Sequence, residues 1–153
     1  MNLSGATEPS TTQLLEPFLM QCINWAGTHT NFDELDPHVR AYVEDWGQEG
    51  DHALIAWEDD QPVGAAWVRY LPYGYGYIAD DVPELAVAVI PEFQGRGIAT
   101  KLISKLHSKL YDEGIESVSL SVNHANPAAA LFAQLGYITA GVNGDSSLMI
   151  AST

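Results

Sequence analysis

Residues 84–99 constrain this chain more than any other stretch. An apolar, β-branched run ends at Pro91, and residues 94–99, Gln-Gly-Arg-Gly-Ile-Ala, open a segment with helical periodicity. This order is typical of a strand, a glycine turn and a helix. Glycines let the backbone come close to a ligand, and the free N–H groups at a helix N-terminus point at it with the positive end of the macrodipole behind them. We therefore expect an anion site at this turn.

Two common phosphate-binding loops do not fit the turn. A Walker A loop needs Lys followed by Ser or Thr after its second glycine, and neither pair follows Gly97. A dinucleotide fingerprint needs a glycine where Thr100 stands and an acidic residue after the next strand, where Asn123 stands. A tight turn that only starts a helix is the structural alternative, so the flanking sequence carries the argument further.

The segment after the turn has the pattern of an amphipathic helix that ends near Gly114. Lys101, Lys105 and Lys109 lie away from the apolar face, and with Arg96 they are four of the six basic residues in a chain of formal charge −14. Arg96 and Lys101 stand in or near the turn, where a polyanion approaching so acidic a protein needs local compensation. We expect Lys105 and Lys109 to be solvated. The apolar face comprises Ile98, Ala99, Leu102, Ile103, Leu106 and Leu110.

Length and composition favour a single domain. With 153 residues, 46% of them hydrophobic, the chain can bury one substantial core, and two domains would be hard to build. We expect residues 1–9 to be a loose N-terminal arm and residues 10–153 to form the domain. No basic segment precedes an apolar one at the N-terminus, and no apolar run approaches the ~20 residues of a membrane span. These features predict a soluble, cytoplasmic protein without a membrane partner.

Charge and reactive residues narrow the function. Twenty acidic residues against six basic ones argue against nucleic acid as a partner. The acidity favours a cationic substrate, or it serves solubility or adaptation to salt. Cys22 is the only cysteine and has apolar neighbours, so we expect a core residue without a chemical role. The histidines show no paired ligand spacing, and no metal is expected. They are His29, His38, His52, His107 and His124.

The whole chain predicts a mixed sheet with helices on its faces, in the order α, α, β, β, β, α, β, α, β, β. The expected helices are residues 10–25, 36–47, 98–113 and 126–135. The expected strands are residues 52–57, 63–70, 84–90, 115–122, 137–142 and 148–150. Between the second and third strands, residues 71–77 alternate tyrosine with glycine. They form either a loop with an aromatic wall around a substrate or a glycine-interrupted strand in which Tyr75 and Tyr77 pack on one face.

Two motifs together resemble those of the GNAT N-acetyltransferase superfamily. The first is Gln94, Gly97 and Ala99, which meet the pattern Gln or Arg, two residues, Gly, one residue, Gly or Ala. The second is Asn126 before a short alanine-rich helix that ends in Leu-Gly-Tyr at residues 135–137. The resemblance implies a single-domain, mixed α/β fold. Its mostly antiparallel sheet of six to seven strands would carry helices on both faces and have splayed central strands.

The resemblance also implies acetyl-CoA, or another acyl-CoA, as the donor. By that analogy the N–H groups of the turn hold the pyrophosphate, and the backbone of residues 87–89 pairs with the pantetheine arm. Unpaired N–H and C=O groups between splayed strands can satisfy such an amide-bearing ligand. Asn126 contacts the same arm or only caps its helix. The implied cofactor-binding residues are Val87, Ala88, Val89, Gln94, Gly95, Arg96, Gly97, Ile98, Ala99, Thr100, Asn126 and Phe132.

The chemistry implied by the resemblance is direct attack of a neutral amine on the thioester. Since amines titrate near ~10, a base must take a proton at neutral pH. Glu84 is the candidate base, with Asp80 or Asp81 behind it. The alternative is that Glu84 faces solvent where its strand begins.

The residue at the position of the family's general acid departs from the family pattern. Many relatives carry a tyrosine in the last helix to protonate the departing sulfur, whereas Phe132 stands here and has no proton to give. Tyr73, Tyr75 or water would have to substitute, and Phe132 would pack against the acyl arm.

Two functions from different classes remain open. The first is an N-acetyltransferase that acts on a primary amine of a small molecule or peptide, cationic if the acidity is functional. The second is a non-catalytic acyl-CoA-binding module that senses the coenzyme or regulates a partner. Exposed edges of a mixed sheet also make a homodimer an expectation.

Overall fold

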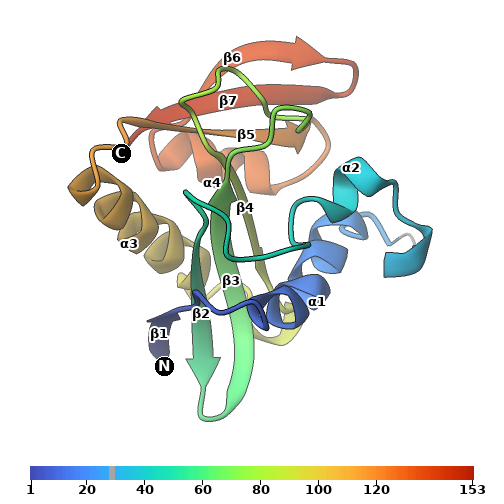
Figure 1. The fold of residues 1–153 in the computed structure, drawn as a ribbon. Coiled ribbons are helices and arrows are strands. Elements are labelled where there is room, and N and C mark those ends of the chain that lie inside the picture. Colours follow the sequence, from blue (N-terminus) through green and yellow to red (C-terminus); the bar gives the residue numbers. More distant parts are fainter. Residues whose placement is uncertain (28–29) are drawn as a thin grey trace.

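The computed structural model describes residues 1–27 and 30–153, and within them seven strands form one sheet in the order β1-β2-β3-β4-β5-β7-β6 (Figure 1). All neighbouring strands are antiparallel except β4 and β5. The strands are β1 (Asn2–Gly5), β2 (His52–Glu58), β3 (Gln61–Arg69), β4 (Glu84–Val89), β5 (Ser117–Asn123), β6 (Ile138–Asn143) and β7 (Ser146–Ser152). This architecture confirms the predicted mixed, mostly antiparallel sheet.

Helices cover both faces of the sheet, as predicted. Helix α3 lies on one side of β2, β3 and β4, and α1 lies on the other side (Figure 1). On α3, Leu102, Leu106 and Leu110 are completely buried, because the apolar positions repeat at the spacing of one helix face. On α1, Leu15 and Phe18 fill the opposite core. The helices are α1 (Thr11–Ile23), α2 (Pro37–Arg40), α3 (Ile98–Asp112) and α4 (Ala128–Gln134), with short 3-10 helices at Phe32–Glu34 and Pro91–Phe93.

The sheet opens between β4 and β5. These parallel strands share one residue pair, Glu84 with Ser119, at the start of β4. Beyond it β4 continues to pair with β3, and β5 continues to pair with β7, while the two strands diverge. The predicted splay of the central strands is confirmed, and its consequence is a gap beside residues 85–89 of β4.

The N-terminal residues correct the prediction of a loose arm. Residues 2–5 form β1, which pairs with residues 54–57 of β2. The Trp57 indole N–H also donates a hydrogen bond to Ser4 Oγ over 2.9 Å. The composition of this segment gave no strand signal, and its order comes from the otherwise open edge of β2.

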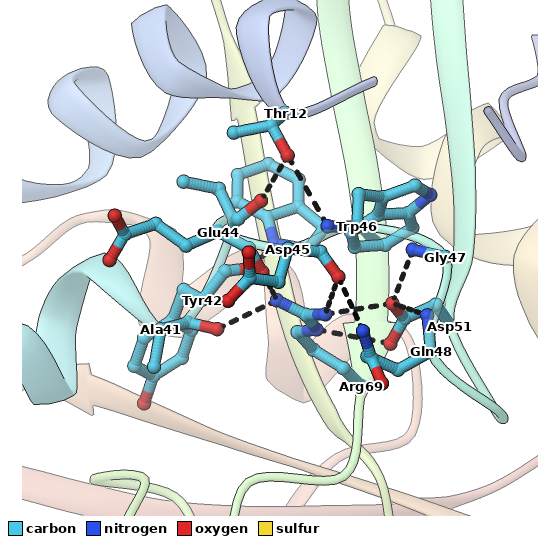
Figure 2. A network of polar contacts seen from close by, with 12 residues as sticks. Thr12, Ala41, Tyr42, Glu44, Asp45, Trp46, Gly47, Gln48, Asp51 and Arg69 are labelled. Atoms are coloured by element: carbon cyan, nitrogen blue, oxygen red, sulfur yellow. Dashed lines mark hydrogen bonds and ion pairs between the residues drawn. The ribbon is translucent and has the colours of Figure 1, made fainter. Parts of the chain in front are cut away.

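The second predicted helix, residues 36–47, is also too long. Helix α2 ends at Arg40, and residues 41–45 form turns. The buried Arg69 on β3 explains this difference, because its guanidinium donates hydrogen bonds to backbone carbonyls of this segment (Figure 2). It donates to the carbonyls of Ala41 over 2.8 Å and Glu44 over 2.6 Å.

Arg69 therefore anchors the segment from Ala41 to Asp51 against the sheet. It forms a bidentate pair with Asp51, with Nε–Oδ1 and Nη2–Oδ2 distances of 3.0 and 2.8 Å, and its guanidinium lies 5.0 Å from the centre of the Trp46 ring. The two charged side chains are only 7% and 4% exposed. Trp67 adds a hydrogen bond from its indole N–H to the carbonyl of Tyr42 over 2.9 Å. Tyr42 is thus held in a fixed place over β3.

Arg69→Met should lower the free energy of unfolding by about 3–5 kcal/mol, because it leaves the Asp51 carboxylate buried without its partner. Urea denaturation followed by circular dichroism measures the change. Lys105→Met removes a positive charge from the exposed face of α3 and should shift stability by less than about 0.5 kcal/mol. Equal effects of the two substitutions would show that the Arg69 network does not stabilise the fold.

Candidate functional site

Two adjoining cavities, each of about 630 Å³, lie along the gap between β4 and β5. The glycine-turn cavity is lined by residues 87–89 and by the turn before α3. The Glu84 cavity is lined by Glu84, Tyr42 and Tyr75. Because the two share several lining residues, they form one continuous groove. The shared residues are Cys22, Trp25, Val87, Asn126, Ala128 and Phe132.

The glycine turn has the geometry of an anion site. Gly95 and Gly97 have φ angles of +78° and +77°, in the left-handed region that favours glycine. The first helical hydrogen bond of α3 runs from the Lys101 N–H to the Gly97 carbonyl over 3.1 Å. The N–H groups of residues 98–100 therefore precede the helical ladder and have no acceptor within the helix. They open at the end of the glycine-turn cavity with the helix dipole behind them.

The polar side chains of the turn are placed differently from one another. Gln94 donates from Nε2 to the carbonyl of Val89 over 2.9 Å, which fastens the turn to the end of β4. Arg96 lies 4.6 Å from the centre of the Phe93 ring and donates to the Glu92 carbonyl over 3.1 Å. The structure thus brings Gln94 to the cavity lining, whereas Arg96 is exposed and outside it.

Helix α4 supplies the opposite wall of the groove. Asn126 Oδ1 accepts a hydrogen bond from the Ala128 N–H over 3.0 Å, so the side chain stabilises the start of α4 while it lines both cavities. Phe132 is buried, packs edge-on against Tyr137 with ring centres 5.8 Å apart, and also lines both cavities. Phe132 therefore forms an apolar part of the groove wall.

Glu84 is buried rather than solvent-facing. It begins β4 beside the point of divergence and is 4% exposed. Its Oε2 accepts a hydrogen bond from the Tyr42 hydroxyl, and Oε1 is buried with no hydrogen-bond partner of ordinary geometry among the described residues. Burial raises the pKa of Glu84 to about 7, against the opposing effects of the Tyr42 hydroxyl and the Gly76 backbone. Near neutral pH this carboxyl can both take and release a proton.

Gly74 and Gly76 bring the backbone of residues 71–77 into close contact with Glu84. A Cβ on Gly74 would collide with Oε1 of Glu84, and one on Gly76 would lie 2.8 Å from the backbone of Leu120. Ser119 Oγ holds this loop down by donating to the Gly76 carbonyl over 2.7 Å. The segment is a series of turns, which corrects the reading as a glycine-interrupted strand. The glycines are needed because the loop approaches Glu84 and β5 too closely for any side chain.

Tyr42 is the site residue that sequence reasoning missed. Its hydroxyl accepts from the Tyr75 N–H over 3.0 Å and donates to Glu84, 42 positions away in the chain. Burial raises the pKa of Tyr42, so the hydroxyl stays protonated and acts as a fixed donor. In the sequence Tyr42 fits the apolar face of a helix, and nothing local marks its contact with β4.

The two tyrosines proposed as acids lie in different places. Tyr73 is 80% exposed, stacks on His38 with ring centres 5.6 Å apart, and lines neither cavity. Tyr75 is 54% exposed and lines the Glu84 cavity. Asp80 accepts from the Tyr77 hydroxyl over 2.6 Å, an exposed contact that does not involve Glu84.

Cys22 of α1 lies where the two cavities meet. Its thiol donates to the Val87 carbonyl over 3.3 Å. Burial raises the pKa of Cys22 to about 12, so the group is a thiol at neutral pH. Because the thiolate is the reactive species, this state agrees with the expectation that Cys22 has no nucleophilic role.

The residues that the structure describes contain no group of three or more His, Cys, Asp or Glu side chains placed to hold a metal ion. His29, which entered the sequence argument about metals, lies outside the described residues. In the same described part of the chain, no helix is long and apolar enough to cross a membrane.

Comparison with known proteins agrees with this geometry. A family model described as the acetyltransferase (GNAT) family matches residues 19–137. The chain belongs to the acetyltransferase (GNAT) family, which confirms the resemblance drawn from the two sequence motifs.

Individual relatives are distant. The [ribosomal protein bS18]-alanine N-acetyltransferase of Haemophilus influenzae is 28% identical over 60 residues, which span 39% of this chain and only 41% of that protein. The PaiA N-acetyltransferase of Thermoplasma acidophilum in complex with coenzyme A has a TM-score of 0.71 and 15% identity, covering 100% of both chains. The ribosomal-protein-alanine N-acetyltransferase of Brucella melitensis has a TM-score of 0.70 and 18% identity, covering 100% of this chain and 99% of that one. The structural likenesses show a shared fold.

Glu84→Gln should stabilise the protein at high pH. Burial raises the carboxyl pKa from 4.5 to about 7, so between these values the folded state keeps a proton that the unfolded state releases. Stability conferred by this group therefore falls as pH rises from 4.5 to 7 and is lost above 7. The difference in free energy of unfolding between the variant and the wild type should therefore be about 3 kcal/mol more in favour of the variant at pH 8 than at pH 4.5.

Urea denaturation at the two pH values measures this gain. Glu49→Gln, the same change at an exposed side chain, is the matched control. A difference between Glu84→Gln and wild type that does not change with pH would contradict the raised pKa.

Proposed function

We propose that this protein transfers an acetyl group from acetyl-CoA to a primary amine of a small molecule or peptide. The observation that carries the proposal is the groove between β4 and β5, which joins an anion site at a helix N-terminus to a buried carboxyl group. Membership of the acetyltransferase (GNAT) family supports the same chemistry.

The glycine-turn cavity suits the donor. The N–H groups of residues 95–100 would hold the pyrophosphate, since a helix N-terminus with left-handed glycines favours phosphate. Residues 87–89 would pair with the amides of the pantetheine arm, because the β5 side of this part of β4 has no strand partner. Asn126, which precedes α4, and Phe132 on α4 would flank the arm. The complex of the Thermoplasma acidophilum protein with coenzyme A supports this assignment by its fold.

Glu84 would act as the general base. The amine nitrogen attacks the thioester carbonyl, an N–C bond forms as the C–S bond breaks, and the nitrogen loses a proton to the Glu84 carboxylate. A pKa of about 7 suits this task, because the base is then ionised in part of the molecules and still holds the proton after transfer. Tyr42 would orient the carboxylate through its hydrogen bond to Oε2.

The departing thiolate would take its proton from water. Phe132 has no proton to donate, and Tyr73 lies outside both cavities. Tyr75 is the remaining tyrosine candidate, but it lines the Glu84 cavity and not the glycine-turn cavity. A groove open to solvent can supply the proton directly.

The acceptor class has support from a relative. The Haemophilus influenzae protein is named for an alanine of a ribosomal protein, which supports a peptide amine as one acceptor and a cytoplasmic location for this chain. A homodimer formed through an exposed edge of the sheet stays a prediction.

Phe132 favours a second candidate function, a non-catalytic module that binds acyl-CoA. A panel of primary amines with acetyl-CoA, followed by release of free thiol, separates the two. Turnover with any amine supports the transferase. Binding of acetyl-CoA without turnover for every amine would favour the module.

Gly97→Val should weaken coenzyme A binding by at least about tenfold, because valine cannot adopt the left-handed φ without strain and the turn must rearrange. Isothermal titration calorimetry measures the dissociation constant. Gly114→Val is the matched control, since Gly114 has a φ of +81° at the far end of α3 and lines neither cavity. If both variants bind coenzyme A equally well, the turn does not hold the pyrophosphate.

The pH dependence of kcat/KM should reflect the ionisation of the Glu84 carboxyl. In the wild type the rate should fall as pH drops below about 7, because the carboxylate becomes protonated. Tyr42→Phe removes the hydrogen bond that favours the ionised form, so this fall should begin at a higher pH. Glu84→Gln should lower kcat by ~10²–10⁴-fold and remove the acidic fall. An unchanged profile in both variants excludes Glu84 as the base.

A further inference from the structure

The Glu84 cavity is unusual in its charge. The chain holds twenty acidic and six basic residues, yet Glu84 is the sole member of either group among the described residues that line this cavity. Neither Lys, Arg nor His lines it within the described part of the chain. The strong acidity of the protein therefore lies outside the place where an acceptor would sit.

The two walls of the cavity differ in chemistry. The wall from α1, the residues just after it and the segment around α2 is aliphatic and aromatic. The wall from β5 and the β6–β7 hairpin carries hydroxyl and amide side chains, together with Leu120 and Val122 of β5. The apolar wall comprises Leu19, Ile23, Trp25, Leu35 and Val39. The uncharged polar wall comprises Ser121, Asn123, Asn143 and Ser146.

From this lining we infer that the acceptor is a primary amine with one positive charge, no carboxylate, an apolar side group and an uncharged hydrogen-bonding group. An α-amino amide has this chemistry, whether it is a small molecule or the amino terminus of a peptide. The inference rests on the proposed function, because it takes the Glu84 cavity as the acceptor site.

Each part of the assignment follows from what the lining offers. Glu84 can receive one ammonium group, and a second would be desolvated without a counter-charge. An acceptor carboxylate would meet no cation and would repel Glu84. The apolar wall rewards a hydrophobic side group, while the hydroxyl and amide wall can satisfy the polar atoms of an amide. Polyamines and free amino acids are therefore poor acceptors.

A panel of matched amines with acetyl-CoA tests the inference, with kcat/KM taken from thiol release. Phenylalanine amide should exceed free phenylalanine by at least about tenfold, because a site without a paired cation rejects the carboxylate. It should exceed glycine amide by ~10–100-fold through the apolar wall. Butylamine should exceed 1,4-diaminobutane. A short peptide with an amino-terminal phenylalanine shows whether peptides or small amides are preferred, and either preference is consistent with the shared chemistry.

A charge-adding variant tests the cavity itself. Val39→Asp places a carboxylate in the apolar wall and should raise the kcat/KM ratio of 1,4-diaminobutane to butylamine by about tenfold. Tyr111→Asp adds the same charge on an exposed site of α3 and should leave that ratio unchanged, which controls for the field of the whole protein.

The outcomes separate the inference from the proposed function. Faster transfer to the diamine or to free phenylalanine would overturn the acceptor assignment and leave acetyl transfer standing. Equal rises of the ratio in Val39→Asp and Tyr111→Asp would also overturn it, because acceptor choice would then follow net charge. If coenzyme A binds but no amine in the panel is acetylated, the proposed function fails and the acceptor assignment fails with it.

Discussion

The divergence of β4 from β5 is the constraint on which the site depends. A parallel pair that continued past Glu84 and Ser119 would close the sheet and satisfy its own backbone groups. Because pairing stops there, one edge of β4 faces a gap instead of a strand. The gap begins at a buried carboxyl group and ends at the glycine turn before α3. A ligand with a phosphate end and an amide-bearing arm matches this layout along its whole length.

Burying Glu84 at the start of the gap requires support from three separate parts of the chain. Tyr42 donates to the carboxylate, the Gly74–Gly76 turn covers it without side chains, and Ser119 fastens that turn to β5. Arg69 acts one step further away, because it holds the segment that carries Tyr42 (Figure 2). Even so, burial removes the carboxyl from water and raises its pKa, because these hydrogen bonds only partly oppose the desolvation. Burial of this carboxyl costs folding stability, and it occurs at the residue that we propose as the base.

The sequence predicted best what local patterns determine. The glycine turn, the amphipathic α3 and both hairpins follow from residue spacing and turn chemistry, and the motifs at Gln94 and Asn126 indicated the family. The parts that failed depend on contacts between distant segments. Residues 2–5 pair with the edge of β2, and a guanidinium from β3 binds the carbonyls that follow α2. Tyr42 could not be found, since its partner is 42 positions away.

The proposed function depends on a buried carboxyl at the divergence of β4 and β5 that titrates near neutral pH. Carbon-13 NMR of the glutamate side-chain carboxyls, with the Glu84 signal identified by its loss in Glu84→Gln, measures that pKa directly. The expected midpoint is about 7. A midpoint near the ordinary value of 4.5 would contradict it, because Glu84 would then be solvated in solution and unsuited to the role assigned to it.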